Sequence, residues 1–348
     1  MTDSSTLPRI ALDAMGGDHA PGVVVEGALA ALAEAPGEFT VLLVGDRLAI
    51  EAELARLGAH DVAGLSLLHA DESVDMAEKA AASARKKTHS SIAVALKAVK
   101  DGAADAMISA GNTGAVASTA MLTLGRIAGV RRPAIAAFIP TDTGGCILLD
   151  CGATADCKPE HLVQFAVMGS VYCRALLGRA APRVGLLNIG EEPGKGNELA
   201  IATHRLLAAS TLPFTGNIEG RDVLSGDADV IVTDGFTGNI VLKFAESVIG
   251  WITGLVRESM SMSGTSGAQP GGGAEAFGPV LANLRSRIDY AEYGGAPLLG
   301  VDGVCFIAHG SSSARAVKNA VRSSARLVRD GLAMRIRDEL AAMEKESQ

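Results

Sequence analysis

The sequence predicts an α/β protein built on a doubly wound, mostly parallel sheet, and three observations lead to this fold class. Short apolar runs repeatedly end in a glycine-containing loop and are followed by a helical pattern. The 348-residue chain is 48% hydrophobic but only 3% aromatic. Ala, Val, Leu and Ile must therefore fill the core, as they do in parallel sheets covered by helices. In addition, residues 104–114 and 228–238 are near copies of each other.

The repeated unit can be followed along the chain. Strands are expected at residues 9–13, 40–44, 146–150, 184–188 and 304–308. Helices are expected to end near residues 33 and 57, to begin at residue 198, and to cover the C-terminal residues 312–348. Open parallel sheets bind ligands outside the carboxyl ends of their strands, and the loops of this chain are expected at that end.

Residues 247–290 break this rhythm. Apolar residues recur at helical spacing over 247–262, a Gly/Ser-rich stretch follows at 263–273, and a second helical pattern covers 280–290. We interpret the segment as a helical hairpin with a flexible Gly/Ser-rich tip, inserted into the α/β domain. No Pro/Ser-rich linker divides the rest of the chain, so residues 1–348 are expected to form a single α/β catalytic domain.

Each near-copy stretch has the pattern of a phosphate-binding loop. Residues 111–114 read Gly-Asn-Thr-Gly and residues 235–238 read Gly-Phe-Thr-Gly, in both cases between an apolar run and a helical pattern. This order places backbone N–H groups at a helix N-terminus, where the peptide dipoles favour an anion. The repeat therefore predicts a site for free phosphate or for a phosphate-rich substrate.

Lys195 is the cation best placed to meet such an anion, because it lies between Gly194 and Gly196 at the start of a helical pattern. The alternative is an exposed loop lysine without a function. The spacing of a nucleotide-binding P-loop is absent. Four neutral side chains beside the two loops can bind phosphate or polarise a carbonyl oxygen, although helix capping explains them as well: Asn112, Thr113, Thr237 and Asn239.

Five aspartates and a histidine near the expected strand ends raise the alternative of a Mg²⁺ site held by carboxylates, although turns and caps explain single members equally well. The set consists of Asp13, Asp18, His19, Asp150, Asp156 and Asp234. We expect no required metal. His309 begins a His-Gly-Ser-Ser sequence that lacks the G-x-S-x-G nucleophile elbow. It is either an orienting or general-acid group or a buried structural histidine.

Composition excludes several classes of protein. The formal charge of −8 and the scarcity of aromatic residues argue against nucleic-acid binding. The five cysteines contain no C-x-x-C pair and are expected to be reduced core residues of a cytosolic protein, with a zinc site as the less favoured alternative. The N-terminus has no signal-peptide pattern, and no apolar run reaches the ~18 residues of a membrane span. The chain is therefore expected in the cytoplasm, at most lying on a membrane surface.

Taken together, the loops resemble those of the bacterial phosphate acyltransferases of phospholipid synthesis, in order and at familiar spacing from about residue 10 to residue 321. The resembling motifs are Leu12-Asp-Ala-Met-Gly-Gly-Asp-His19, Ser109-Ala-Gly-Asn-Thr-Gly114, Asn188-Ile-Gly190, Lys195-Gly-Asn-Glu198, Asp234-Gly-Phe-Thr-Gly-Asn239, Tyr293-Gly-Gly-Ala296 and Ala308-His-Gly-Ser-Ser312.

The resemblance implies that inorganic phosphate attacks the thioester of a fatty acyl group on acyl carrier protein. The acyl phosphate product would then pass to a membrane glycerol-3-phosphate acyltransferase. The family fold is similar to that of phosphotransacetylases and isopropylmalate-type dehydrogenases. Its members are homodimers that need no dinucleotide and no tightly bound metal. A weak, transient contact with the membrane surface is expected, because the Gly/Ser-rich hairpin tip has few basic residues.

In this reading Lys195 balances the phosphate charge, Asn239 binds the oxyanion or phosphate, and His309 is a secondary catalytic candidate. The expected phosphate- and substrate-binding residues are Asp13, Gly16, Gly17, Asp18, His19, Gly111, Asn112, Thr113, Gly114, Asn188, Gly196, Asn197, Asp234, Gly235, Thr237, Gly238 and Ser311.

Two alternatives belong to other classes. The first is a metal- and NAD-dependent decarboxylating dehydrogenase on a similar fold, but no G-x-G-x-x-G follows the first expected strand. The second is a non-catalytic adaptor that docks at membranes through the hairpin. A scaffold has no need for glycine and polar residues at so many strand ends.

Overall fold

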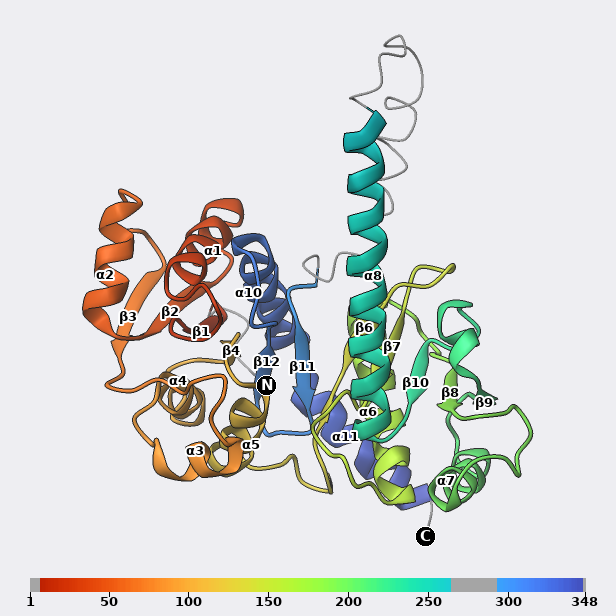
Figure 1. The fold of residues 1–348 in the computed structure, drawn as a ribbon. Helices are drawn as coiled ribbons and strands as arrows, with labels where there is room; N and C mark the ends of the chain where they lie inside the picture. The colour runs from red at the N-terminus through yellow and green to blue at the C-terminus, as the bar shows by residue number, and fades with distance from the viewer. Residues whose placement is uncertain (1–6, 264–292, 347–348) are drawn as a thin grey trace.

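The computed structural model describes residues 7–263 and 293–346 and consists of two sheets surrounded by helices (Figure 1). The seven-stranded sheet has the order β3-β2-β1-β4-β12-β11-β5. Its strands are β1 (Arg9–Asp13), β2 (Thr40–Gly45), β3 (Leu65–His69), β4 (Ala106–Ser109), β5 (Ala134–Ile135), β11 (Ala296–Leu299) and β12 (Val304–Ile307). β1, β2, β3, β4 and β12 are parallel, and β11 is antiparallel to both of its neighbours.

The five-stranded sheet has the order β6-β7-β10-β8-β9. Its strands are β6 (Ala137–Ile139), β7 (Cys146–Leu149), β8 (Val184–Leu187), β9 (Phe214–Ile218) and β10 (Val230–Val232). Only β6 runs antiparallel to its neighbour. The predicted α/β class with mostly parallel strands is confirmed. The strands divide between two sheets, however, because the chain leaves β5 at Ala136 and enters β6 in the other sheet.

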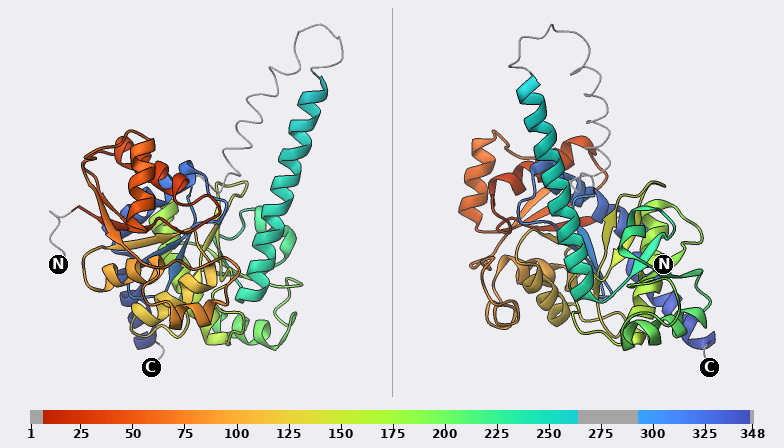
Figure 2. Two further views of the ribbon diagram at one scale, coloured as in Figure 1. Left: turned by 60° about the vertical axis from the view of Figure 1, so that its left-hand side comes forward. Right: turned by 45° about the vertical axis from the view of Figure 1, so that its right-hand side comes forward.

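The helices cover the faces of both sheets (Figure 2). In the first half lie α1 (Gly22–Glu34), α2 (Arg47–Arg56), α3 (Ala80–Lys86), α4 (Ser91–Lys100) and α5 (Thr113–Thr123). The remaining helices are α6 (Pro159–Leu177), α7 (Glu198–Ala208), the 3₁₀ turn η1 (Gly220–Leu224), α8 (Gly235–Ser263), α10 (Ala314–Arg329) and α11 (Leu332–Glu346). Every position of β4, β7, β10 and β12 is buried, which explains why these strands are continuous apolar runs.

Two expected helices have different bounds in the structure. The single helix expected over residues 312–348 is two helices, α10 and α11. The break falls at Gly331, whose φ of +64° lies in the left-handed region where glycine commonly ends helices. The first arm of the expected hairpin is continuous with the helix that begins at Gly235, so α8 is one helix from Gly235 to Ser263. The rest of the hairpin lies outside the described residues.

Four of the five cysteines lie in the core, as the sequence predicts. Cys146, Cys151, Cys173 and Cys305 are buried, Cys157 is half-buried, and none is in a disulfide. Burial raises the pKa of the Cys146 and Cys305 thiols to about 12. Within residues 7–263 and 293–346, no helix has both the length and the apolar composition needed to span a membrane.

Candidate active site

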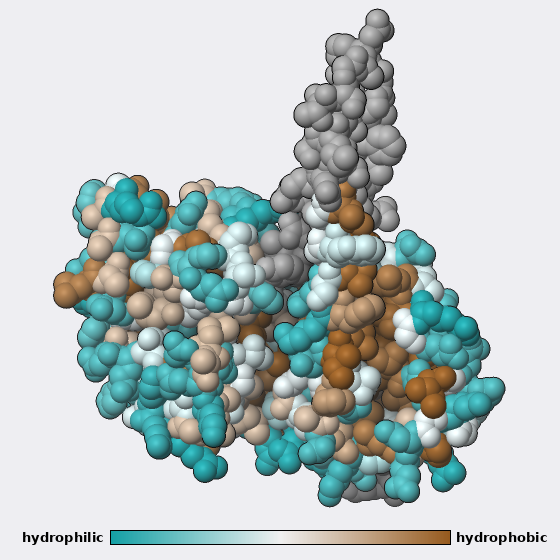
Figure 3. Space-filling view, in the orientation of Figure 1, coloured by the Kyte–Doolittle hydropathy of each residue, from teal (hydrophilic) through white to brown (hydrophobic). Residues whose placement is uncertain are grey.

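The loops at the carboxyl ends of the strands meet along one edge of the molecule. Ile135 ends β5, which runs in the same direction as β4 and β12. Its amide donates to the Asp150 carboxylate, which follows the carboxyl end of β7, at 2.9 Å, and its carbonyl accepts from the Cys151 amide at 2.9 Å. The carboxyl edges of the two sheets are therefore joined at this point, and the expected site residues lie on both sides of it. Figure 3 shows a hollow between the two halves beside α8.

A first cluster surrounds Asp13 at the end of β1. Its buried carboxylate accepts from the Ser109 hydroxyl at 2.6 Å and from the Met15 amide at 3.1 Å. Ser109 in turn accepts from the Gly111 amide at 3.0 Å. Burial raises the pKa of Asp13, and the hydrogen bonds from Ser109 and from Ser91 only partly oppose it. Asp13 thus fastens the first near-copy loop to the loop after β1.

The loop after β12 joins this cluster. The Asp18 amide donates to the Gly310 carbonyl at 2.8 Å, and His309 Nδ1 lies 2.8 Å from the Ser311 hydroxyl. A small pocket is lined by Gly16, Gly17, His19, Gly310 and Ser312 among others. The structure therefore brings together the predicted residues of the β1, β4 and β12 loops, and His309 lies at the same edge as the first near-copy loop.

Asn112 serves as the N-cap of α5. Its Oδ1 accepts from the Ala115 amide at 3.0 Å, while its Nδ2 donates to the carbonyls of Met76 and Glu78 at 2.9 and 3.1 Å. All of these groups are protein groups, so the side chain is committed to structure and the capping interpretation holds for it. The Thr113 and Gly114 amides at the start of α5 have no carbonyl to bond within the helix, and that they bind an anion stays a prediction.

The second near-copy loop is arranged differently. Asp234 accepts from the Thr237 amide at 2.9 Å and from the Thr237 hydroxyl at 2.8 Å. The start of α8 therefore already holds a carboxylate, and a phosphate there would compete with it. That Thr237 binds phosphate directly stays a prediction. Asn239, one turn along α8, is half-buried beside Gly152, where an added Cβ would lie 3.5 Å from Asn239 Oδ1.

Lys195 lies in the loop between β8 and α7. Its side chain is exposed, and among residues 7–263 and 293–346 no carboxylate forms an ion pair with it. Asn188 Nδ2 donates to the Lys195 carbonyl at 2.9 Å and Asn188 Oδ1 accepts from the Ile189 amide at 2.8 Å, so Asn188 shapes this loop. Asn197 is the N-cap of α7, accepting from the Ala200 amide at 2.9 Å. β8 is the parallel neighbour of β10, so the Lys195 loop and the start of α8 leave the same sheet edge.

Asp150, considered above as a metal ligand, is fully occupied by backbone amides. Its carboxylate accepts from Ile135, Gly152, Ala153 and Thr154 at 2.6–3.1 Å. Burial raises its pKa to about 6, although these four bonds favour the charged form. In the described part of the chain, no three His, Cys, Asp or Glu side chains converge as metal ligands do.

Two polar strand residues that support these loops were not among the predicted site residues. Ser109 bridges Asp13 and Gly111, and Asn217 on β9 supports the loop that carries Lys195. Ser109 corresponds to Thr233 when the two near copies are aligned, so their comparison could have indicated it. No local signal marks Asn217, because its partners are distant in sequence.

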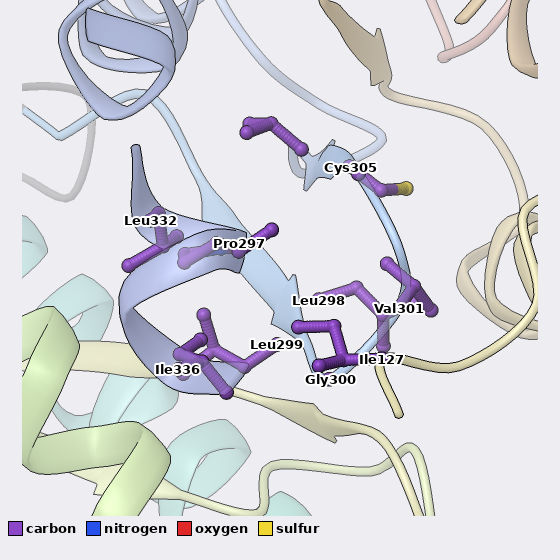
Figure 4. Close-up of a pocket in the computed structure, with 12 residues that line it drawn as sticks. Ile127, Pro297, Leu298, Leu299, Gly300, Val301, Cys305, Leu332 and Ile336 are labelled. Carbon is purple, nitrogen blue, oxygen red and sulfur yellow. The ribbon is translucent and has the colours of Figure 1, made fainter. Parts of the chain in front are cut away.

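An apolar pocket lies at the opposite end of β12, under α11 (Figure 4). It is lined by Ile127, Leu298, Val301, Cys305 and Ile336 among others. Its lining contains no charged side chain, and β12 separates it from the glycine loops, which lie at the other end of that strand. We therefore assign the pocket to core packing.

Comparison with known proteins shows the family to which the chain belongs. A family model described as "Fatty acid synthesis protein" matches residues 8–335. A phosphate acyltransferase from Pelotomaculum thermopropionicum is 46% identical over 336 residues, covering 97% of this chain and 96% of the relative. A phosphate acyltransferase from Heliobacterium modesticaldum is 50% identical over 314 residues, covering 90% and 92%.

A solved structure shows the same fold. A phosphotransacetylase from Streptococcus pyogenes aligns with a TM-score of 0.62 and 16% identity, over 93% of this chain and 94% of that one. The near-complete coverage by relatives of almost half-identical sequence shows more than the fold: this chain belongs to the phosphate acyltransferase family and is an acyltransferase.

Proposed function

We propose that this chain transfers a fatty acyl group from acyl carrier protein to inorganic phosphate, giving acyl phosphate for phospholipid synthesis. The acyl phosphate would be consumed by a membrane glycerol-3-phosphate acyltransferase. The observation that carries this proposal is the loop of Lys195, an exposed cation between two glycines that has no carboxylate partner among the described residues. It lies in the loop just before α7, whose N-terminal N–H groups would add to its attraction for an anion.

The chemistry needs no covalent enzyme intermediate. A phosphate oxygen attacks the thioester carbon, the C–S bond breaks, and the carrier sulfur leaves as a thiol with the proton that the hydrogen phosphate gives up. Burial raises the pKa of the Cys146 and Cys305 thiols and makes them poor nucleophiles, which fits direct attack by phosphate. The protein's task is to hold phosphate by Lys195 and helix amides and to stabilise the oxyanion through Asn239. A single oxyanion donor contributes about 2.7–4 kcal/mol in comparable sites.

Replacement of Lys195 by Ala tests the proposal. Because Lys195 carries the proposed phosphate contact, Lys195→Ala should lower phosphate-dependent turnover of an acyl carrier protein thioester by about 10²–10³-fold. The midpoint temperature of thermal unfolding should remain close to that of the parent, since the Lys195 side chain is exposed. Lys97→Ala is the matched control, because Lys97 is an exposed lysine of α4 paired with Asp101. Near-normal turnover of Lys195→Ala would remove the proposed role of Lys195.

We further propose a homodimer that is cytoplasmic and transiently attached to the membrane surface. The support is an exposed apolar face on α8, the brown stripe of Figure 3, and its large members are Phe236, Ile240, Phe244, Trp251, Ile252 and Leu255. A continuous row of large exposed apolar side chains is typical of a surface that contacts another protein or lipid. A second copy of α8 packed along this face would cover it.

A further inference from the structure

We propose that Asn217 is a positioning residue for Lys195, acting through the turn that precedes it; this inference rests on the proposed function. Asn217 lies on β9, the edge strand beside β8, and is only 6% exposed. Its Nδ2 donates to the Glu192 carbonyl at 2.8 Å. The same carbonyl accepts from the Lys195 amide at 3.0 Å. Asn217 therefore holds the first residue of the turn whose last residue is Lys195.

A second group fixes Asn217 itself. His204 of α7 places Nδ1 3.0 Å from Asn217 Oδ1, and its ring packs edge-on against Phe214 with centroids 5.1 Å apart. Since Nδ2 of Asn217 is the donor to Glu192, its Oδ1 is the acceptor and His204 Nδ1 carries the proton. Both polar ends of this buried amide are thereby satisfied by specific partners.

The strand is irregular in the way that this contact requires. Phe214 and Asn217 are three residues apart, yet both contact His204 and so face α7. A regular strand would place them on opposite faces. The pairing of β8 with β9 slips by one residue after Val184, so that Gly185 pairs with Gly216 rather than Thr215. Gly216, with φ of +105°, accommodates this β-bulge, which turns Asn217 toward the Lys195 loop.

Two backbone carbonyls of the loop thus accept hydrogen bonds from asparagine side chains: that of Glu192 from Asn217, and that of Lys195 from Asn188. An exposed glycine-rich loop would otherwise lose much of its binding energy in ordering its backbone. Both hydrogen bonds are made to backbone carbonyls of the loop and neither involves the Lys195 ammonium, which can therefore contact substrate. The arrangement fits preorganisation of a phosphate-binding lysine.

The test is a double-mutant cycle with phosphate as the varied substrate and an acyl carrier protein thioester held in excess. Asn217→Ala should raise the KM for phosphate about tenfold, because one anchoring hydrogen bond is lost, while kcat changes less than about twofold. In the Lys195→Ala background the same substitution should have almost no further effect, since residues that act through one another are not additive. Ile218→Val is the control, a small core change at the adjacent position of β9.

His204→Phe provides an independent variant if Asn217→Ala does not fold, because it keeps the ring against Phe214 but removes the proton donor. His204→Phe should also raise the KM for phosphate, by a smaller factor than Asn217→Ala. The inference is overturned if both variants match Ile218→Val, or if Asn217→Ala raises the KM equally when Lys195 is absent. A Lys195→Ala enzyme that retains normal phosphate kinetics would instead overturn the proposed role of Lys195 and, with it, this inference.

Discussion

The two near-copy segments, residues 104–114 and 228–238, are anchored alike but begin their helices differently. At the first, Arg9 donates to Asp105 Oδ2 through its amide at 2.8 Å and through Nε at 3.0 Å. At the second, Arg183 repeats this pair of bonds to Asp229 Oδ2 at 2.9 and 3.1 Å. In both segments the aspartate at the second position of the repeat is held by an arginine from outside the repeat, and we call this pair of bonds the arginine clip.

The difference lies at the helix start. The neutral Asn112 caps α5, which begins at Thr113, whereas α8 begins at Gly235 and holds the carboxylate of Asp234. A carboxylate at a helix N-terminus occupies the favourable position for an anion. At the second loop a carboxylate already occupies this position, so we infer that the first loop is the better candidate for phosphate. Similarity of two loops in sequence does not give them the same electrostatic role.

Adding a methyl group to the last glycine of each loop should separate the two most strongly. A Cβ at Gly238 would lie 2.0 Å from the carbonyl oxygen of Asp150, a residue whose amide is held by the Thr233 carbonyl at 3.1 Å. A Cβ at Gly114 would lie 2.8 Å from the Ala80 Cβ of the short helix α3, which can shift. We expect Gly238→Ala to lower the free energy of unfolding by about 3 kcal/mol or more and Gly114→Ala by about 1 kcal/mol. Urea denaturation measures both, and equal losses would contradict the contrast.

Much of this architecture could be predicted from the sequence. The strands that precede the glycine loops are apolar runs that can be located in the sequence, and the alternation of strands with helices predicts that they are parallel. The division into two sheets could not be predicted, because it depends on a change of sheet at Ala136, which has no local signature. The commitment of Asn112 to Met76 and Glu78 was also hidden, since those carbonyls are 36 and 34 residues away.

The arginine clips should differ next, because their carboxylates differ in burial. The Asp229 side chain is 4% exposed and the Asp105 side chain 30% exposed. Arg183→Ala leaves a buried carboxylate whose one remaining charged partner among the described residues is Arg179 at 3.3 Å. We expect a loss of about 2–3 kcal/mol for Arg183→Ala and about 1 kcal/mol or less for Arg9→Ala, measured by urea denaturation at pH 7.

Acid should weaken this contrast. Burial alone would raise the pKa of Asp229 and Asp105, but hydrogen bonds from Arg183 and Arg9 outweigh it and hold both pKa values below the ordinary 3.8. A carboxyl whose pKa is lowered by folding stabilises the fold above its unfolded pKa and loses that contribution as the pH falls. The gap between parent and Arg183→Ala should therefore shrink below about pH 4. A gap that widened in acid would show that the arginine acts through packing.

The smallest expected contrast concerns the two threonines. The Thr237 hydroxyl donates to Asp234 at 2.8 Å, whereas the exposed Thr113 has no such bond within the described residues. Valine keeps the shape and β-branching of threonine, so only the hydroxyl is tested. Thr237→Val should cost about 1 kcal/mol of stability, the net value of one hydrogen bond to a charged group that remains partly solvated, and Thr113→Val close to zero. If the first loop binds phosphate, their kinetic effects should be reversed, with Thr113→Val raising the KM for phosphate and Thr237→Val leaving it near the parent value. A rise in KM for Thr237→Val alone would mean that phosphate displaces Asp234, and it would assign the phosphate site to the second loop.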